Sequence, residues 1–393
     1  MFLRTQPSSA SGTDRWHNVQ RLHSAEEVQR LAGTIRIRHT LAELGAERLW
    51  DLVQRGECRI APGVGTPDEA LQLVRAGCQI LATAPEGLQH APWSGRGASE
   101  VNAVARVQRA LVDADRAAHL AGNRSVRWLA PLLVDLSVAN CTPLEIVEAM
   151  RVRIEAGAAG VRIDDRAGCS SGGMGERLAV TSTSAFVRSI SAARLAADVE
   201  GVPTVLIAVS SAARATHLTS DHDPRDAGFA VGTRDSWGMQ PVQGGIAMAI
   251  ARALEAAPFA DIVCLQAAAP SLFEAEQFAQ AIHARHPHKP LAYEVPAEVH
   301  WARHMSEEDL ARFEQRLSEL GYALHFLPRA TFHARNAAAF DLATDLRLDG
   351  VGGWARLRAH ELSNEDKGYG TVRERRDGAD AWASAVRGAI EAA

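Results

Sequence analysis

Acidic and hydroxyl side chains stand at the ends of several short apolar segments of this 393-residue chain. Asp135 and Ser137 end one segment, Asp164 ends the next, and Glu294 ends a later one. Mg²⁺ prefers oxygen ligands and keeps several waters, so one or two protein carboxylates suffice to hold it. Asp135 and Asp164 are therefore candidate magnesium ligands. The alternative is that both aspartates cap helices or pair with arginines.

A glycine-rich segment, residues 166–177, follows Asp164 and contains Cys169, Ser171 and Glu176. Its spacing fits neither a P-loop nor a dinucleotide-binding fingerprint. Its backbone N–H groups could wrap an anionic substrate, or the segment could be a linker. Such a loop would leave Cys169 exposed as a nucleophile or base, although a lone cysteine without a nearby histidine is more often inert.

The elements that must position these residues follow a regular alternation of apolar, β-branched runs and helical patterns. The candidate strands are 59–62, 79–83, 128–136, 160–164, 204–209, 261–266, 291–295 and 323–327. Strands that are apolar on both faces are typical of parallel sheets covered by helices. Eight such units in series predict an α/β fold, a TIM-type (β/α)8 barrel.

In a barrel enzyme the active site lies at the C-terminal ends of the strands. Polar residues at or just after those ends are therefore candidates for binding a substrate. They are Thr83, Ser137, Ser211, Glu294 and Arg329.

The rest of the chain divides around the barrel. We expect a flexible tail over residues 1–14, helices over 15–56, the barrel over 57–356, and a helical extension over 357–393. The barrel carries a long polar insertion at 211–243, and long loops in compact domains are often functional. The terminal helices are expected either to contact other subunits or to plug the ends of the barrel.

Composition restricts the class of protein. The net charge is −5, 47% of the residues are hydrophobic, and no basic face stands out, which argues against nucleic-acid and membrane-surface partners. The five cysteines have no metal-binding or redox spacing, which favours a reducing compartment. The N-terminus lacks a signal-peptide pattern and no segment is apolar enough to span a membrane, so we expect a cytoplasmic protein.

Many phrases of the sequence resemble isocitrate lyase, in the same order and over almost the whole chain, from about residue 16 to about residue 386. The matching phrases are 31–34, 40–42, 45–50, 155–161, 193–199, 201–206, 218–221, 291–293, 332–334 and 367–369. The resemblance implies a barrel of the phosphoenolpyruvate mutase superfamily whose tetramers exchange C-terminal helices. It also implies cleavage of isocitrate to succinate and glyoxylate with Mg²⁺, and hence a small carboxylic-acid ligand and a homotetramer or homodimer.

The catalytic phrases depart from the family pattern. The family loop Lys-Lys-Cys-Gly-His-Met-Gly-Gly-Lys, aligned on Met174, has lost its cysteine, histidine and flanking lysine, and Cys169 lies two positions upstream of the family cysteine. Cys169 or Glu176 would then be the acid or base, with Ser171 as a further catalytic candidate. An enzyme that has lost its acid and its activating residues has lost catalysis, not only affinity.

The binding phrases have changed as well. The metal motif Asp-Ala-Glu-Ala-Gly becomes 135–139, which keeps Asp135 but not the glutamate, while Glu-Asp after strand four becomes 164–165. Arg-Thr-Asp after strand five becomes 209–211, which loses an arginine, and Asn-Cys-Ser-Pro-Ser after strand seven becomes 294–298. The Glu-Arg-Thr of the insertion becomes 233–235, so Arg234 remains a substrate-binding candidate.

Two functions remain open. The chain is either a carbon–carbon lyase, or related enzyme, on a small 2-oxo or 2-hydroxy acid other than isocitrate, or a catalytically inactive relative with a structural, regulatory or metabolite-binding role. New polar groups at strand ends, such as Glu294, favour the enzymatic function, because loss of the family's activity would not by itself introduce a new carboxylate. Isocitrate cleavage itself is not expected, since binding three carboxylates requires charge-assisted donors such as arginine.

Overall fold

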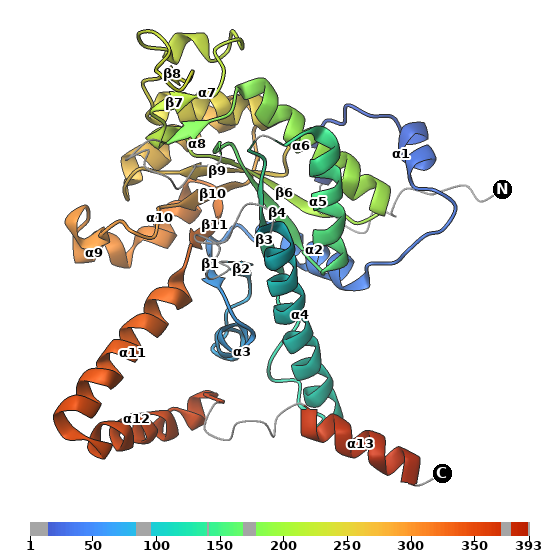
Figure 1. The fold of residues 1–393 in the computed structure, drawn as a ribbon, viewed down its shortest axis with the longest axis vertical. Coiled ribbons are helices and arrows are strands. Elements are labelled where there is room, and N and C mark those ends of the chain that lie inside the picture. Colours follow the sequence, from blue (N-terminus) through green and yellow to red (C-terminus); the bar gives the residue numbers. More distant parts are fainter. Residues whose placement is uncertain (1–14, 84–95, 140, 168–177, 371–378, 392–393) are drawn as a thin grey trace.

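Eight parallel strands close into a barrel at the centre of the molecule (Figure 1). The computed structural model describes residues 15–83, 96–139, 141–167, 178–370 and 379–391. Around the barrel the strands follow the order β1-β11-β10-β9-β6-β4-β3-β2. They are β1 (Arg59–Val64), β2 (Leu81–Thr83), β3 (Leu132–Ser137), β4 (Gly160–Asp164), β6 (Val205–Ser210), β9 (Ile262–Gln266), β10 (Leu291–Glu294) and β11 (Tyr322–Leu327). The predicted barrel and its eight strands are confirmed.

Helices surround the barrel, and several of them begin at a capping side chain. At α3 and α5 a threonine caps the helix, proline follows it, and a glutamate completes a capping box, which satisfies backbone N–H groups of the first turn. The helices up to β11 are α1 (Ala25–Leu31), α2 (Thr40–Val53), α3 (Pro67–Arg75), α4 (Arg96–Leu120), α5 (Pro143–Glu155), α6 (Thr183–Glu200), α7 (Ile246–Ala256), α8 (Leu272–Arg285), α9 (Glu307–Ala311) and α10 (Phe313–Glu319).

The apolar core has two parts, and strand periodicity separates them. Leu133, Ile207, Cys264, Ala292 and Phe326 belong to the core inside the barrel, whereas alternate residues of the same strands pack outward against the helices. Because successive side chains of a strand point to opposite faces, the residue two positions after an interior residue also faces the barrel axis. This rule fixes which strand-end side chains meet at the mouth of the barrel.

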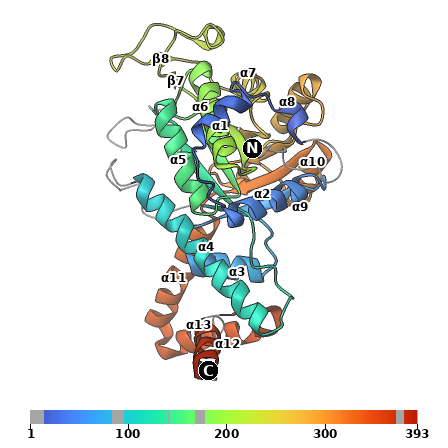
Figure 2. The same ribbon diagram turned by 90° about the vertical axis from the view of Figure 1, so that its right-hand side faces the viewer.

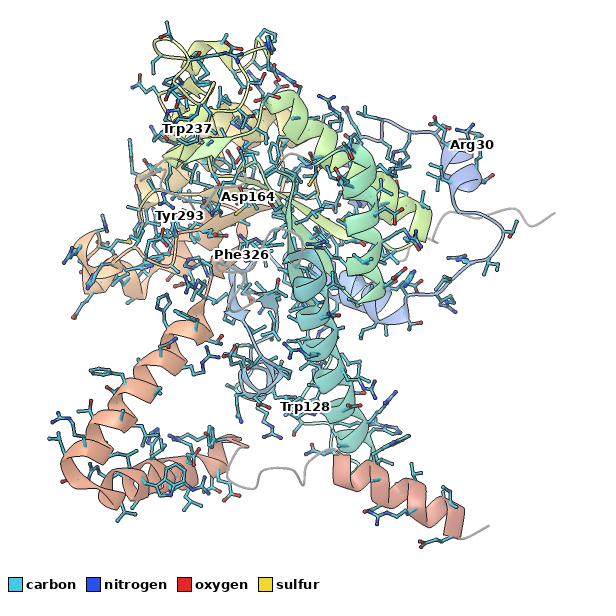
Figure 3. All side chains as sticks on the ribbon, in the orientation of Figure 1. Arg30, Trp128, Asp164, Trp237, Tyr293 and Phe326 are labelled. Carbon is cyan, nitrogen blue, oxygen red and sulfur yellow. The ribbon has the colours of Figure 1, made fainter. Side chains whose placement is uncertain are left out.

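The insertion after β6 contributes two strands to a small sheet beside the mouth, and β5 (Ala179–Val180), which lies between β4 and α6 in the chain, contributes the third. The pairs β5 with β7 (His217–Leu218) and β7 with β8 (Gln240–Pro241) build three short strands. Trp237, which is 64% exposed, lies on this insertion at the far end from the C-terminal helices (Figure 3).

Three helices at the C-terminal side extend away from the barrel (Figures 1 and 2). They are α11 (Ala330–Asp349), α12 (Val351–Ser363) and α13 (Ala379–Glu391). Helix α11 contains no buried residue, and Phe340 and Val351 are 73% and 79% exposed. We call α11 and α12 the helical arm.

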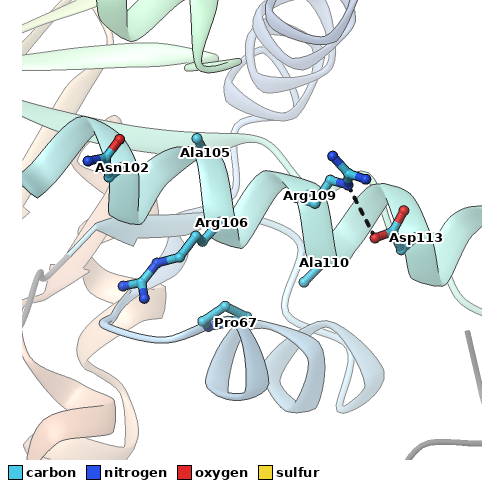
Figure 4. A pocket seen from close by; sticks show the side chains of 7 residues that line it. All are labelled: Pro67, Asn102, Ala105, Arg106, Arg109, Ala110 and Asp113. Carbon is cyan, nitrogen blue, oxygen red and sulfur yellow. Dashed lines mark ion pairs between the residues drawn. The ribbon is translucent and has the colours of Figure 1, made fainter. Parts of the chain in front are cut away.

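A groove of 1090 Å³ runs between α3 and α4, outside the barrel (Figure 4). It is lined by Pro67, Asn102, Ala105, Arg106, Arg109, Ala110 and Asp113. None of the residues predicted to catalyse, bind substrate or bind metal lines this groove. In the part of the chain that the structure describes, no helix combines the length and the apolar character needed to cross a membrane.

Candidate active site at the mouth of the barrel

Polar side chains from neighbouring strand ends form one connected set at the mouth of the barrel. Four of them lie two positions beyond a residue of the interior core: Asp135, Ser211, Gln266 and Glu294. Arg162 and Asp164 alternate along β4 with Val161 and Ile163, which pack outward. We call this set the strand-end network. Its members are Asp135, Arg162, Asp164, Arg166, Ser211, Gln266 and Glu294.

Arg162 of β4 lies in the interior of the barrel between two carboxylates. Its Nη2 donates to Glu294 Oε2, and its Nη1 lies 3.4 Å from Asp135 Oδ1. The guanidinium carbon lies 4.1 Å from the ring centroid of Phe326, a cation–π distance. Burial alone would lower the pKa of Arg162, but Asp135 and Glu294 outweigh it and hold the pKa above its usual value. Arg162 is therefore a permanent buried cation.

Glu294 is almost fully buried, and both of its oxygens have partners. Oε1 accepts a hydrogen bond of 2.8 Å from Gln266 Nε2, and Oε2 accepts from Arg162. Burial raises the pKa of Glu294, although Arg162 opposes the rise. Asp135 differs because half of its side chain, 50%, is exposed. Within the network, Asp135 is thus the carboxylate that an entering ligand can reach.

At the end of β4, Asp164 is held by Arg166 and Ser211. Arg166 donates from Nη2 at 2.6 Å and from its backbone N at 2.9 Å. Burial alone would raise the pKa of Asp164, but Arg166 and Ser211 hold it below its usual value. Ser211 Oγ lies 2.7 Å from Asp164 Oδ1 and 2.9 Å from Gln266 Oε1. Its single hydroxyl proton can serve only one of these oxygens at a time.

A second, fully buried ion cluster lies behind the network. Asp165 points outward from the end of β4 and accepts a 2.8 Å bond from Arg252 Nε of α7. Arg252 Nη1 also donates to Asp226 Oδ1 at 2.9 Å and to Thr183 Oγ1 at 3.0 Å. Burial raises the pKa of Asp165, and Arg252 opposes that rise. This cluster ties the insertion, the start of α6 and the end of β4 together, which fixes the position of Asp164.

The predicted binding residues are divided between this network and other places. Ser211 and Glu294 belong to the network, and Ser137 pairs in register with Asp164 across β3 and β4. Thr83 follows an interior alanine, so it points outward, and its buried hydroxyl has no hydrogen-bond partner. Their roles in binding a substrate stay predictions.

The two predicted binding arginines lie outside the network. Arg234 belongs to the insertion, where its Nε donates to Asp221 at 3.1 Å. Arg329 precedes α11 with a left-handed φ of 59°, and its guanidinium lies 4.0 Å from the ring of Phe332. The catalytic candidates Cys169, Ser171 and Glu176 lie outside the described residues.

The two aspartates predicted to bind magnesium, Asp135 and Asp164, both lie beside arginines. Asp135 and Asp164 come from neighbouring strand ends, as expected, but Arg162 Nη1 lies 3.4 Å from Asp135 Oδ1 and Arg166 Nη2 donates to Asp164 Oδ2 at 2.6 Å. Among the described residues, no group of three His, Cys, Asp or Glu side chains is placed to hold a metal ion. This donor set, with guanidinium partners in place, does not fit a hard divalent cation. Magnesium binding stays a prediction of the resemblance.

Sequence reasoning did not assign roles to Arg162, Arg166 or Arg252. A signal for Arg162 was present, because it alternates with Asp164 in the segment Gly-Val-Arg-Ile-Asp and so shares its interior face. No comparable signal pointed to Arg252, which is 87 residues from its partner Asp165.

The solved structure of 2,3-dimethylmalate lyase, a member of the PEP mutase/isocitrate lyase superfamily, has a similar fold. Its TM-score is 0.53 at 17% identity, over 82% of this chain and 96% of that one. At the level of sequence, the isocitrate lyase family profile matches residues 104–240 and 233–387. The chain is 37% identical to isocitrate lyase of Halalkalibacterium halodurans, over 94% of this chain and 89% of the relative. It is 34% identical to isocitrate lyase of Mycobacterium tuberculosis, over 92% and 88%. This chain belongs to the isocitrate lyase family.

Proposed function

We propose that this family member is a carbon–carbon lyase, or a related enzyme, acting on a small 2-oxo or 2-hydroxy carboxylic acid other than isocitrate. The observation that carries the proposal is the continuous strand-end network. Loss of function requires no new buried carboxylate, yet Glu294 is buried with a partner on each oxygen, Arg162 and Gln266. Such an arrangement costs stability unless every group is satisfied, which supports a retained role in binding.

Charge argues against isocitrate as the substrate. The network contains three carboxylates and two guanidiniums, and the guanidiniums of Arg162 and Arg166 are already paired with carboxylates. A tricarboxylate would bring three more negative charges to a site where charge-assisted donors are already engaged. An acid with one or two carboxylates could enter beside the exposed side of Asp135 and bind the guanidinium of Arg162 together with Asp135 and Glu294. The loop of Cys169, Ser171 and Glu176 would supply the acid or base.

The test uses the full chain and a panel of small 2-hydroxy and 2-oxo acids together with isocitrate. For the 2-hydroxy acids and isocitrate, release of a 2-oxo product is followed as its phenylhydrazone. The 2-oxo acids react with phenylhydrazine themselves, so their cleavage is followed by chromatography of the products. We expect product from at least one small acid, none from isocitrate, and loss of activity in Asp135→Asn. The matched control Asp51→Asn, an exposed aspartate on α2, should keep full activity. Turnover of isocitrate at a rate comparable to that of the small acid would contradict the proposal.

A second candidate function, a non-catalytic metabolite-binding or structural relative, is favoured by a different observation. Each charged side chain of the network already has an oppositely charged partner, so the mouth is stable without a ligand. Thermal unfolding with the same acids separates the two functions. A ligand at a hundred times its dissociation constant adds about 2.7 kcal/mol. Stabilisation without product indicates a binding protein, and neither effect indicates a structural role.

We also propose that the chain assembles as a homodimer or homotetramer through the helical arm. Helix α11 has 20 residues and buries none of them, whereas helices in water depend mainly on packing of an apolar face. Phe340, Leu348 and Val351 are all more than half exposed on this arm. Covering them with a second copy of the arm would supply the missing packing.

Analytical ultracentrifugation of the full chain tests this assembly. We expect a dimer or tetramer for the native chain, and a smaller species for the double variant Phe340→Asp and Val351→Asp. The control Trp237→Asp changes an equally exposed aromatic residue on the insertion and should not change the mass. A monomeric native chain at micromolar concentration would overturn the proposed assembly.

A further inference from the structure

The interior of the barrel holds a cation of the protein's own at the place where the sequence predicts a divalent ion. Arg162 is 6% exposed, and its two terminal nitrogens contact carboxylates from two different strands, Asp135 of β3 and Glu294 of β10. The labelled side chains of Asp164 and Phe326, which lie at this centre, are drawn in Figure 3. One positive group thus bridges carboxylates that converge on one point.

Converging carboxylates are costly in a dry interior unless a positive charge neutralises them. Mg²⁺ or another hard cation is one solution, and a guanidinium is the other. A guanidinium stays charged at any ordinary pH, so it cannot leave Asp135 and Glu294 by losing a proton. A metal ion could bridge Asp135 and Glu294 in the place of the guanidinium only if Arg162 moved away from them. Its position over Phe326 stabilises it where it is.

The neighbouring carboxylate is held in the same way. Asp164 lies two residues after Arg162 on the same face of β4, and Arg166 binds it through both a guanidinium nitrogen and the backbone N. Each carboxylate of the network therefore faces a guanidinium. The carboxylates that pair with Arg162 and Arg166 are the same ones that would bind a metal ion. An arginine and a metal ion therefore compete for the same oxygens.

Arg162 also has a third donor, Nε, beside the two terminal nitrogens that contact carboxylates. Its Nε is buried and has no hydrogen-bond partner among the residues that the structure describes. Buried N–H groups are normally satisfied by protein, water or a ligand. A carboxylate or enolate oxygen of a bound acid would satisfy it. A guanidinium beside an anionic oxygen can stabilise negative charge that develops there, which a divalent cation would otherwise do.

We propose that the guanidinium of Arg162 occupies the place of a divalent cation, so that the site binds a small carboxylic acid without metal. The occupation of the cation's place does not depend on the proposed lyase activity. The binding of an acid rests on that proposed function.

The experiment titrates Mn²⁺ into the full chain and follows free Mn²⁺ by its electron paramagnetic resonance signal. For the native chain we expect the signal to match that of buffer, with no site tighter than about 1 mM on the scale of ordinary affinities. Arg162→Met keeps an unbranched side chain but removes the guanidinium and its charge, and should create a Mn²⁺ site at least tenfold tighter. Arg162→Lys keeps the charge and should create none.

Two controls locate the new site. Asp135→Asn in the Arg162→Met background should abolish the gained binding. Arg48→Met removes a partly buried arginine that donates to the carbonyl oxygen of Leu129, away from the network, and should gain no Mn²⁺. Should Arg162→Met not fold, the native titration decides alone.

Stoichiometric Mn²⁺ binding by the native chain that Asp135→Asn abolishes would overturn the inference, as would a folded Arg162→Met that gains no site. Neither outcome depends on turnover. If no acid of the panel stabilises or reacts with the chain, the proposed function fails while the Mn²⁺ result still stands. If an acid of the panel does stabilise the chain, we expect the same stabilisation in EDTA as in Mg²⁺.

Discussion

Removing the guanidinium of Arg252 tests how the end of β4 is held. Arg252 is 1% exposed and joins two buried carboxylates, those of Asp165 and Asp226, with distances of 2.8 and 2.9 Å. It also donates from Nη2 to the carbonyl oxygen of Thr181 at 2.7 Å. The substitution Arg252→Met keeps much of the side-chain volume, so the loss of charge and hydrogen bonds dominates over the loss of packing.

The expected cost follows from the burial of the cluster. Breaking a buried ion pair by removing one partner costs about 3–5 kcal/mol, because the other charge is left uncompensated. Arg252→Met leaves both Asp165 and Asp226 in this state. We therefore expect the free energy of unfolding to fall by at least about 3 kcal/mol at neutral pH. The end of β4 should loosen, since Asp165 adjoins Asp164 of the strand-end network.

The loss should depend on pH with a definite sign. Burial raises the pKa of Asp165, and Arg252 opposes the rise, so the variant raises it further. A carboxyl whose pKa is higher in the folded state contributes its full stability below the unfolded value, about 3.9 for Asp, and loses it as pH rises through the folded value. The deficit of Arg252→Met should thus be largest at neutral pH and shrink towards pH 4.

Urea unfolding at several pH values between 4 and 7.5 provides the measurement. Arg316→Met is the matched control, because Arg316 pairs with Glu319 on α10 with 55% of its side chain exposed. Exposed pairs contribute about 0–1 kcal/mol, so this variant should be near neutral. Equal losses in the two variants, or a loss at Arg252→Met that does not change with pH, would refute the electrostatic reasoning.

Three further predictions concern the core. Burial lowers the pKa of Lys289 from 10.5 to about 8, so the native chain should gain about 3 kcal/mol as pH rises from about 8 to about 10.4, and urea unfolding of Lys289→Met should show no such gain. Burial alone would raise the pKa of Asp261, but partners including Arg194 hold it well below its usual range. The stabilisation by the ionised carboxylate is therefore present above about pH 4 and lost as pH falls further. Asp261→Asn should cost about 3–5 kcal/mol at neutral pH, and unfolding measured at low pH should show a smaller deficit. A Cβ on Gly160 would lie 2.9 Å from the carbonyl oxygen of Val205, so Gly160→Ala should lower the midpoint of thermal unfolding at a cost of about 1–3 kcal/mol, and an unchanged midpoint would contradict that steric reading.

The sequence predicted the barrel because hydrophobic periodicity is a local property. The expected strand 160–164 coincides with β4 (Gly160–Asp164), and the other seven expected strands overlap their counterparts. The helix caps that the structure shows at Thr66 and Thr142 are also local, because each threonine side chain accepts a hydrogen bond from a backbone N–H three residues further on. The pairing of β7 with β8 was not predicted, because each strand has only two residues and carries no periodicity.

The sequence by itself also determined which strand ends carry carboxylates, hydroxyls and amides, and hence where the candidate site lies. Only the tertiary structure decided what those groups contact. Glu294 lies 132 residues from Arg162 along the chain but beside it in space, because closing the barrel brings distant strands together. Whether two converging aspartates bind a metal or an arginine depends on the charge of every other side chain that faces the barrel axis. That balance is a property of the closed barrel and not of any local segment.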